Sequence, residues 1–158
     1  LLEYISECSN TGYEVFSHNQ APDGNFVSPT LIELNSIDDI NEEKFGPILH
    51  VIKYKTDELD QILNALKNKQ YGLTMGVHSR IESKADDIIN KSIAGNTYIN
   101  RDIVGAVVGS QPFGGTGLSG TGFKAGGPNY LLQFVDERSI TKNTVAFGGN
   151  AEILNLED

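Results

Sequence analysis

Between residues 48 and 100, the spacing of apolar residues alternates between a pattern typical of strands and one typical of helices. Three short segments are rich in β-branched and aromatic residues, which favours buried strands. Between them, apolar residues recur every three or four positions, as on one face of a helix. The predicted order is strand 48–54, helix 56–71, strand 73–78, helix 79–94 and strand 97–99. Helical connections of this length imply parallel strands with right-handed crossovers, and therefore an open parallel sheet of the α/β class.

The first 47 residues give weaker signals. Leu2, Ile5 and Cys8 have helical spacing, and a turn cluster occupies residues 21–25. Residues 26–34 predict a strand, and Pro29 within it favours an edge strand or the entry to a strand.

A glycine-rich segment follows the last predicted strand of the 48–100 region. Residues 104–128 contain nine glycines and two prolines, which excludes a regular element. Ligands of open α/β sheets bind beyond the carboxyl ends of the strands, and a loop this long is usually functional. We therefore expect a ligand-binding loop here, followed by the start of a helix at 130–135 and a strand at 139–147.

This loop contains a formal dinucleotide fingerprint, from Gly115 through Gly117 to Gly120. A true fingerprint follows a strand and begins a helix that receives the pyrophosphate. Here Gln111-Pro112-Phe113 precedes the glycines and four more glycine or proline residues follow, so a helix cannot grow through the segment. A phosphate P-loop is excluded as well, because Lys124 is displaced from the Gly-Lys-Ser/Thr ending.

Composition narrows the class of protein. The 158 residues are enough for one domain with a core, and 39% hydrophobic with 21% charged residues is typical of globular chains. A net charge of −9 disfavours nucleic-acid binding, and no apolar run could span a bilayer. The chain opens on Leu1 and its single methionine is Met75, so we expect a fragment or a processed product.

The single cysteine, Cys8, allows no internal disulfide and no multi-thiolate metal site. Without a secretory signal, a reducing cytoplasmic location is expected. As a nucleophile Cys8 is poorly placed, because a catalytic thiolate needs a cationic or helix-N-terminal setting and its sequence neighbours are the acidic Glu3, Glu7 and Glu14. A small buried helix residue is the better interpretation. The three histidines are far apart in the sequence, so neither a catalytic triad nor a metal site is indicated.

Two motifs carry a family resemblance. Glu43-Lys-Phe-Gly-Pro47 resembles the Glu-x-Phe-Gly-Pro motif of NAD(P)-dependent aldehyde dehydrogenases. Pro112-Phe-Gly-Gly115, followed by Ser119-Gly120, resembles their Pro-Phe-Gly-Gly-x-x-x-Ser-Gly motif. The predicted β–α–β–α–β unit separates the two motifs, with the family features Tyr71-Gly-Leu73 and Ala94-Gly-Asn96 between them. The resemblance implies the C-terminal part of an aldehyde dehydrogenase catalytic domain.

The resemblance extends to a subfamily. Residues 103–115 and 124–128 are similar to the pyrroline-5-carboxylate (glutamate semialdehyde) dehydrogenases. Residues 141–150 resemble the dehydrogenase end of the bifunctional proline utilisation A enzymes of bacteria. The likeness covers nearly all of the chain, but only the last part of that dehydrogenase domain. It implies a parent enzyme that oxidises L-glutamate γ-semialdehyde to glutamate in proline catabolism, with FAD as a second cofactor if the parent is bifunctional.

The resemblance also assigns roles by position. It implies that Glu43 binds the ribose of NAD and that Phe45 packs near its nicotinamide. Gly105 and Ala106 match the positions whose backbone N–H groups hold the substrate carboxylate, and Phe113 matches an aromatic that lines its aliphatic part. From residue type alone, a plain turn at Gly105 and core packing at Phe113 are the better interpretations, and the subfamily resemblance reverses this preference. Whether NAD or NADP is used stays open.

The family nucleophile is a cysteine in a Gly-Gln-x-Cys context, which Ser6-Glu-Cys-Ser9 does not match. The Rossmann half that holds most of the cofactor is absent too. We therefore predict no catalytic residue in this chain and no activity of the chain by itself, its partners being the remainder of the parent enzyme and the semialdehyde substrate.

The expected division is a partial catalytic domain at 1–138, with an anchor loop at 103–128, and a C-terminal strand and tail at 139–158. In the family such a strand joins the sheet of a neighbouring subunit, so a homo-oligomer is expected. The alternative is a noncatalytic interaction module whose tail mediates oligomerisation.

Overall fold

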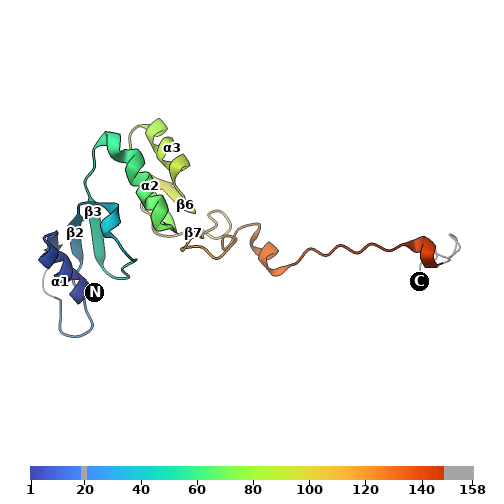
Figure 1. Cartoon of the computed structure of the whole chain (residues 1–158), viewed down its shortest axis with the longest axis horizontal. Coiled ribbons are helices and arrows are strands. Elements are labelled where there is room, and N and C mark those ends of the chain that lie inside the picture. Colours follow the sequence, from blue (N-terminus) through green and yellow to red (C-terminus); the bar gives the residue numbers. More distant parts are fainter. Residues whose placement is uncertain (19–20, 148–158) are drawn as a thin grey trace.

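The computed structural model describes residues 1–18 and 21–147. Two α/β lobes follow one another, and an extended tail leads away from the second (Figure 1). The first lobe contains helix α1 (Leu2–Thr11) and a sheet of β1 (Glu14–Ser17), β2 (Thr30–Leu34) and β3 (Ile48–Ile52). β2 lies in the centre, antiparallel to β1 and parallel to β3.

One face of this sheet forms the core of the first lobe. Cys8 of α1 packs with Ile32 and Leu34 of β2, and all three are buried. Side chains alternate between faces along a strand, so the next residues of each strand point to the opposite side. There Phe16, Leu31 and Leu49 lie in one register row, and the Phe16 and Leu49 side chains are exposed. A groove of about 610 Å³ runs over this row.

The second lobe contains two helices and short strands. α2 is preceded by a 3₁₀ turn, η2 (Thr56–Glu58), in which the Lys55 backbone N–H donates to the Glu58 carboxylate. The remaining elements are α2 (Leu59–Lys69), β4 (Tyr71–Gly72), β5 (Thr74–Val77), α3 (Glu82–Lys91), β6 (Asn96–Ile99) and β7 (Thr116–Gly117). β5 is parallel to β6, and β4 is antiparallel to β7.

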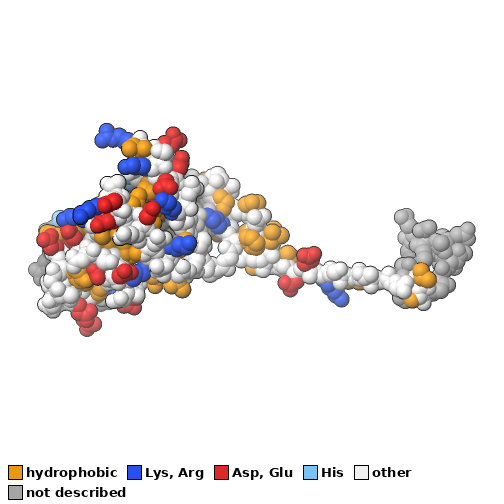
Figure 2. Space-filling view, turned by 45° about the horizontal axis from the view of Figure 1, so that its top comes forward, with side chains coloured by type: hydrophobic (Ala, Val, Ile, Leu, Met, Phe, Trp, Pro, Cys, Tyr) orange, Lys and Arg blue, Asp and Glu red, His pale blue; other side chains and the backbone are white. Residues whose placement is uncertain are grey.

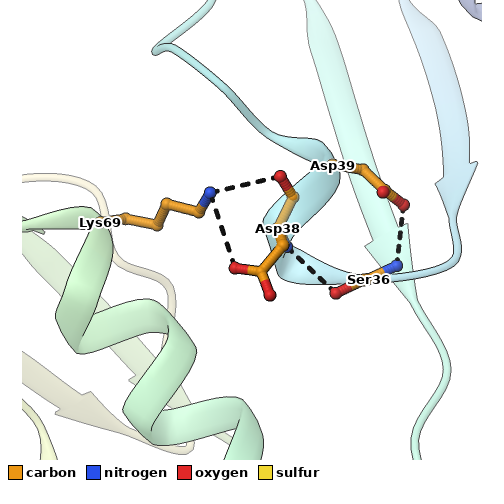
Figure 3. Close-up of polar contacts among 4 residues, drawn as sticks. All are labelled: Ser36, Asp38, Asp39 and Lys69. Carbon is orange, nitrogen blue, oxygen red and sulfur yellow. Dashed lines mark hydrogen bonds and ion pairs between the residues drawn. The ribbon is translucent and has the colours of Figure 1, made fainter.

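A polar contact joins the two lobes. The turn η1 (Ile37–Asp39) follows β2, and its Asp39 carboxylate accepts the Ser36 backbone N–H at 2.9 Å. The Lys69 ammonium, in the last turn of α2, lies 3.8 Å from the Asp38 carboxylate and donates to the Asp38 carbonyl (Figure 3). The loop that carries Glu43 thus begins at a turn held against α2.

The α/β class and its parallel strand pairs are confirmed, and α3 is the expected helical crossover between β5 and β6. The prediction of one continuous parallel sheet is wrong. β3 pairs with β2, while β5 and β6 form a separate pair. Hydrophobic spacing gives the type and order of elements but not their partners. β2 begins at Thr30, directly after Pro29, which confirms the strand entry; β2 is central rather than an edge.

The tail differs from the prediction. A 3₁₀ helix, η3 (Tyr130–Phe134), stands where a helix was expected to start, and the strand expected at 139–147 is absent. Its place is taken by extended chain and a second 3₁₀ turn, η4 (Thr144–Phe147). A strand needs a partner for its N–H and C=O groups, and within the described residues no segment pairs with this one. Residues 148–158 of the expected tail lie outside the described residues.

Apolar side chains gather where the chain leaves the second lobe for the tail (Figure 2). Those exposed by half or more are Leu131, Leu132, Phe134, Val135 and Ile140. Within residues 1–18 and 21–147, no helix combines the length and apolarity required to cross a membrane.

Candidate functional site

The first candidate segment is the loop between η1 and β3, which contains Glu43 and Phe45. Both residues are exposed, and Phe45 retains 82% of its possible accessible surface. Lys44 between them lies over the Tyr4 ring, with Nζ 4.5 Å from the ring centroid, and pairs with Glu42. Among the described residues, the Glu43 carboxylate has no hydrogen-bond or ion-pair partner. Lys44 therefore ties the loop to α1 and leaves its two neighbours available to a ligand.

Tyr4 and His50 form a pair beneath this loop. The Tyr4 hydroxyl lies 2.7 Å from His50 Nε2, and the two rings meet edge to face. Burial, then the hydrogen bond and charge of Cys8, raise the pKa of Tyr4 to about 12. Burial and then the Lys44 charge lower the pKa of His50. This hydrogen bond and ring contact connect helix α1 to strand β3 beneath the loop.

The second candidate segment is the anchor loop, residues 103–128, which follows β6. Its start is fixed by Asn100, whose side-chain oxygen accepts the Ser79 backbone N–H and whose amide donates to the Ser79 carbonyl, both at 2.9 Å. The loop therefore leaves the carboxyl end of a parallel strand from a defined position, as the sequence indicated.

Gly105 and Ala106 lie exposed near the beginning of the anchor loop. Gly105 has φ +86°, a conformation that residues with a Cβ rarely adopt, and the space around it is open. Its carbonyl accepts a hydrogen bond from the Tyr98 hydroxyl at 3.3 Å. Among the residues that the structure describes, no acceptor faces the backbone N–H of Gly105 or of Ala106. Two adjacent backbone donors are thus available to an anion.

Phe113 is half-buried, and its backbone is fully bonded on both sides. It forms a two-residue bridge with Ala125, in which the N–H of each donates to the carbonyl of the other at 3.0 and 2.9 Å. On the opposite side, the Asn96 amide donates to the Pro112 carbonyl at 3.0 Å and its oxygen accepts the Gly114 N–H at 3.0 Å. Asn96 itself is buried, with 8% exposure.

A close approach holds the anchor loop against β6. A Cβ on Gly95 would lie 2.1 Å from the Gly114 carbonyl oxygen, so only glycine fits at this position. The Lys124 ammonium donates to the Gly95 carbonyl from the far part of the loop. The loop is therefore packed onto the strand backbone rather than projecting freely.

The formal dinucleotide fingerprint forms no phosphate-binding turn. Thr116–Gly117 is β7 and pairs with β4, and residues 118–128 contain no helix. The interpretation against a Rossmann fingerprint at this place is confirmed. Cys8 is also confirmed as a buried helix residue of the core.

Gly105, Ala106 and Phe113 thus share one loop that is tied to β6. Glu43 and Phe45 belong to the first lobe, and no hydrogen bond, ion pair or ring contact within residues 1–18 and 21–147 joins them to that loop. Sequence reasoning named Asn96 only as part of the Ala94-Gly-Asn96 family feature and gave Tyr98 no role, whereas both residues hold the loop. The available signal was that Asn96 and Tyr98 alternate along a strand expected to be buried. Each buried polar side chain needs a hydrogen-bond partner.

The fold and the two motif-bearing loops define a part of an aldehyde dehydrogenase. Residues 1–140 match the aldehyde dehydrogenase family model, and the chain belongs to that family.

More specifically, the relatives are those that the anchor loop indicated. The bifunctional protein PutA of Rhizobium meliloti is 54% identical over 134 residues, which are 85% of this chain and 10% of that protein. The crystal structure of proline utilization A from Bradyrhizobium japonicum superposes with a TM-score of 0.82 at 48% identity, covering 94% of this chain and 15% of that one.

A 1-pyrroline-5-carboxylate dehydrogenase from Thermus, solved with bound NAD, gives a TM-score of 0.74 at 36% identity. This match covers 85% of the present chain and 26% of the Thermus chain. The chain therefore spans about a tenth of the bifunctional relatives and about a quarter of the monofunctional enzyme.

Proposed function

We propose that this chain is the C-terminal part of the catalytic domain of an NAD-dependent L-glutamate γ-semialdehyde (pyrroline-5-carboxylate) dehydrogenase of proline catabolism. The observation that carries the proposal is the pair of unpartnered backbone N–H groups at Gly105 and Ala106, on the same pinned loop as Phe113. The kinship to a pyrroline-5-carboxylate dehydrogenase and to PutA supports it.

The substrate side of the proposal follows from the chemistry of the loop. Glutamate semialdehyde has an α-carboxylate, a short aliphatic chain and an aldehyde. Two exposed N–H groups suit the carboxylate, because charge-assisted hydrogen bonds to backbone donors are strong. Ala106 adds no side-chain donor, so this contact depends on the backbone alone. The half-buried Phe113 ring offers an apolar surface for the aliphatic carbons.

The residues of the first loop fit NAD. An unpartnered carboxylate such as that of Glu43 can accept both hydroxyls of a ribose. The exposed Phe45 ring can pack against a planar nicotinamide. When bound, NAD accepts the hydride from the substrate carbon. The contribution of this chain is to hold the ribose and to limit the mobility of the ring.

The nucleophile belongs to the parent outside this chain. Cys8 is buried in the core, so the isolated chain has no thiol that could attack an aldehyde, and we propose that it is inactive alone. In this proposal residues 1–138 form the partial catalytic domain, FAD accompanies a bifunctional parent, and the location is the cytoplasm.

A second role, homo-oligomerisation, rests on the tail. Exposed Val135 and Ile140 lie on an extended chain after η3 that has no strand partner within the described residues, and such a segment can add to the sheet of another subunit. Residues 139–158 are proposed as this oligomerisation segment. Light scattering of the chain with and without residues after Arg138 tests it, and an unchanged mass on truncation contradicts it.

A chimera tests the main proposal. In the Thermus 1-pyrroline-5-carboxylate dehydrogenase, the segment that matches this chain is replaced by this chain, and NADH formation from glutamate semialdehyde is followed. We expect the chimera to retain activity and to lose it when Gly105 is changed to Pro, which removes one of the two N–H donors and cannot adopt the φ of +86° at this position. A chimera with native circular dichroism that forms no NADH contradicts the proposal.

A further inference from the structure

We infer that Tyr98 is a positioning residue that aims the Ala106 N–H group at the substrate carboxylate, an inference that rests on the proposed function. The hydrogen bond of Tyr98 goes to the Gly105 carbonyl, which is part of the same peptide unit as the Ala106 N–H. In a trans peptide the C=O and N–H bonds point in opposite directions. The structure contains no cis peptide within its described residues.

This hydrogen bond sets the direction of the Ala106 N–H group. With the Gly105 carbonyl turned toward Tyr98, the Ala106 N–H points away from β6 toward the side where no acceptor lies. Gly105, at φ +86° in open space, could otherwise rotate through several conformations at little cost. One hydrogen bond from a buried side chain therefore fixes the orientation that the flexible residue leaves undetermined.

The strand provides a rigid base for this contact. Tyr98 is 7% exposed and Asn96 is 8% exposed, and residues two apart on a strand share a face. Arg101 covers the Tyr98 ring, with its guanidinium carbon 4.7 Å from the ring centroid. The tyrosine ring is thus held by packing, and only its hydroxyl reaches the anchor loop.

Asn96 and Tyr98 bond the anchor loop in different ways. The two peptide units around Phe113 are bonded on one side by Asn96 and on the other by Ala125, so every donor and acceptor there is used. The Gly105–Ala106 unit is bonded on one side alone. Asn96 fixes a side chain in place, whereas Tyr98 holds a peptide unit and leaves its donor free for a ligand.

NMR of the isotope-labelled chain tests the inference, with L-glutamate as the probe and L-isoglutamine, whose α-carboxylate is replaced by an amide, as its match. Tyr98→Phe removes the hydroxyl and keeps the ring. We expect it to move the Gly105 carbonyl and Ala106 amide signals and to leave the Gly114 amide unchanged. Asn96→Asp should move Phe113 and Gly114 instead, and Tyr54→Phe, an exposed tyrosine, should move neither.

The affinities of the two probes then distinguish a positioning role of Tyr98 from general support of the fold. Tyr98→Phe should lower the affinity for L-glutamate by about threefold to tenfold, as expected for the loss of one ordinary hydrogen bond. The affinity for L-isoglutamine should stay unchanged. Equal weakening of both probes, or an unmoved Ala106 amide, overturns the inference. A wild-type chain in which L-glutamate shifts nothing at Ala106 contradicts the proposed substrate site as well, whereas a wild-type shift that Tyr98→Phe leaves intact contradicts the inference alone.

Discussion

The Tyr4 hydroxyl is hydrogen-bonded to His50 Nε2 at 2.7 Å, which joins α1 to β3. The same Tyr4 ring lies under the Lys44 ammonium, so this pair connects the core of the first lobe with the loop that carries Glu43 and Phe45. A cationic His50 would be partly buried and would face the positive charge of Lys44. The neutral state of one histidine therefore supports the geometry of the proposed ribose-binding loop.

This arrangement predicts a pH dependence of stability. Burial and Lys44 hold the pKa of His50 below its ordinary value of 6.5, so the unfolded chain takes up the proton first as the pH falls. The His50 contribution is fully present above the unfolded pKa and is lost as the pH falls through the folded pKa. We expect the free energy of unfolding to fall as the pH drops below the ordinary histidine pKa of 6.5.

Urea unfolding at several pH values measures this effect. His50→Gln keeps a hydrogen-bonding group opposite Tyr4 but cannot be protonated, and it should flatten the dependence. His78→Gln, at an exposed position after β5, is the matched control and should leave the slope in place. An identical slope in the wild-type and His50→Gln chains would show that His50 is not the group involved.

The turn η1 predicts a difference between two adjacent carboxylates. The Asp39 side chain accepts the backbone N–H groups of Asn35 and Ser36, at 3.1 and 2.9 Å. The neighbouring Asp38 side chain makes a single ion pair at 3.8 Å with Lys69. Asp39→Ala should lower the free energy of unfolding by about 1 kcal/mol or more, and Asp38→Ala by less than about 0.5 kcal/mol. Equal losses in denaturant unfolding would contradict the assignment of the Asp39 carboxylate as the group that stabilises the turn η1.

The close packing of the anchor loop on β6 predicts that Gly95→Ala is harmful. The new Cβ would meet the Gly114 carbonyl oxygen at 2.1 Å, and a backbone atom cannot turn aside. We expect a loss of about 1–3 kcal/mol in stability and a displaced Phe113 amide signal. In Gly76→Ala the added Cβ meets the Ile103 side chain, which can rotate, so the loss should be smaller. A Phe113 signal that stays in place in Gly95→Ala would refute the close approach.

The two candidate ligand segments should respond separately in the chimera with the Thermus enzyme. Glu43→Ala removes a carboxylate that is proposed to accept two ribose hydroxyls, and should raise the KM for NAD by about tenfold with a smaller effect on the KM for the semialdehyde. Lys44→Ala, which breaks the contact with Tyr4 but keeps both ligand residues, should have a weaker effect of the same kind. A change in the semialdehyde KM alone on Glu43→Ala would place that carboxylate elsewhere.

Local chemistry made much of this fold predictable. Apolar spacing placed β3, α2, β5, α3 and β6 in the correct order, and the glycine content marked the anchor loop. Strand partners were not predictable, because pairing depends on contacts such as Ile32 on Cys8 between segments distant in sequence. The strand expected at 139–147 alternates in sequence, but alternation by itself cannot supply the second strand that its hydrogen bonds require.

The candidate site shows the same division. Motif resemblance named Glu43, Phe45, Gly105, Ala106 and Phe113, whose ligand roles stay proposals. It gave no hint that Asn96 and Tyr98 determine how the loop lies, since their roles arise only when the loop folds back onto β6. A glycine such as Gly95 looks like a turn residue in the sequence, and the packing of Gly114 against it shows a different reason for its presence.

The central claim is that this chain holds the substrate and cofactor contacts of an aldehyde dehydrogenase but not its nucleophile. The most direct measurement is NADH formation from L-glutamate γ-semialdehyde by the purified chain alone, beside its Cys8→Ser variant. We predict a rate equal to the protein-free blank for both. A rate above the blank that disappears in Cys8→Ser would contradict the account, because it would place the reacting thiol in this chain.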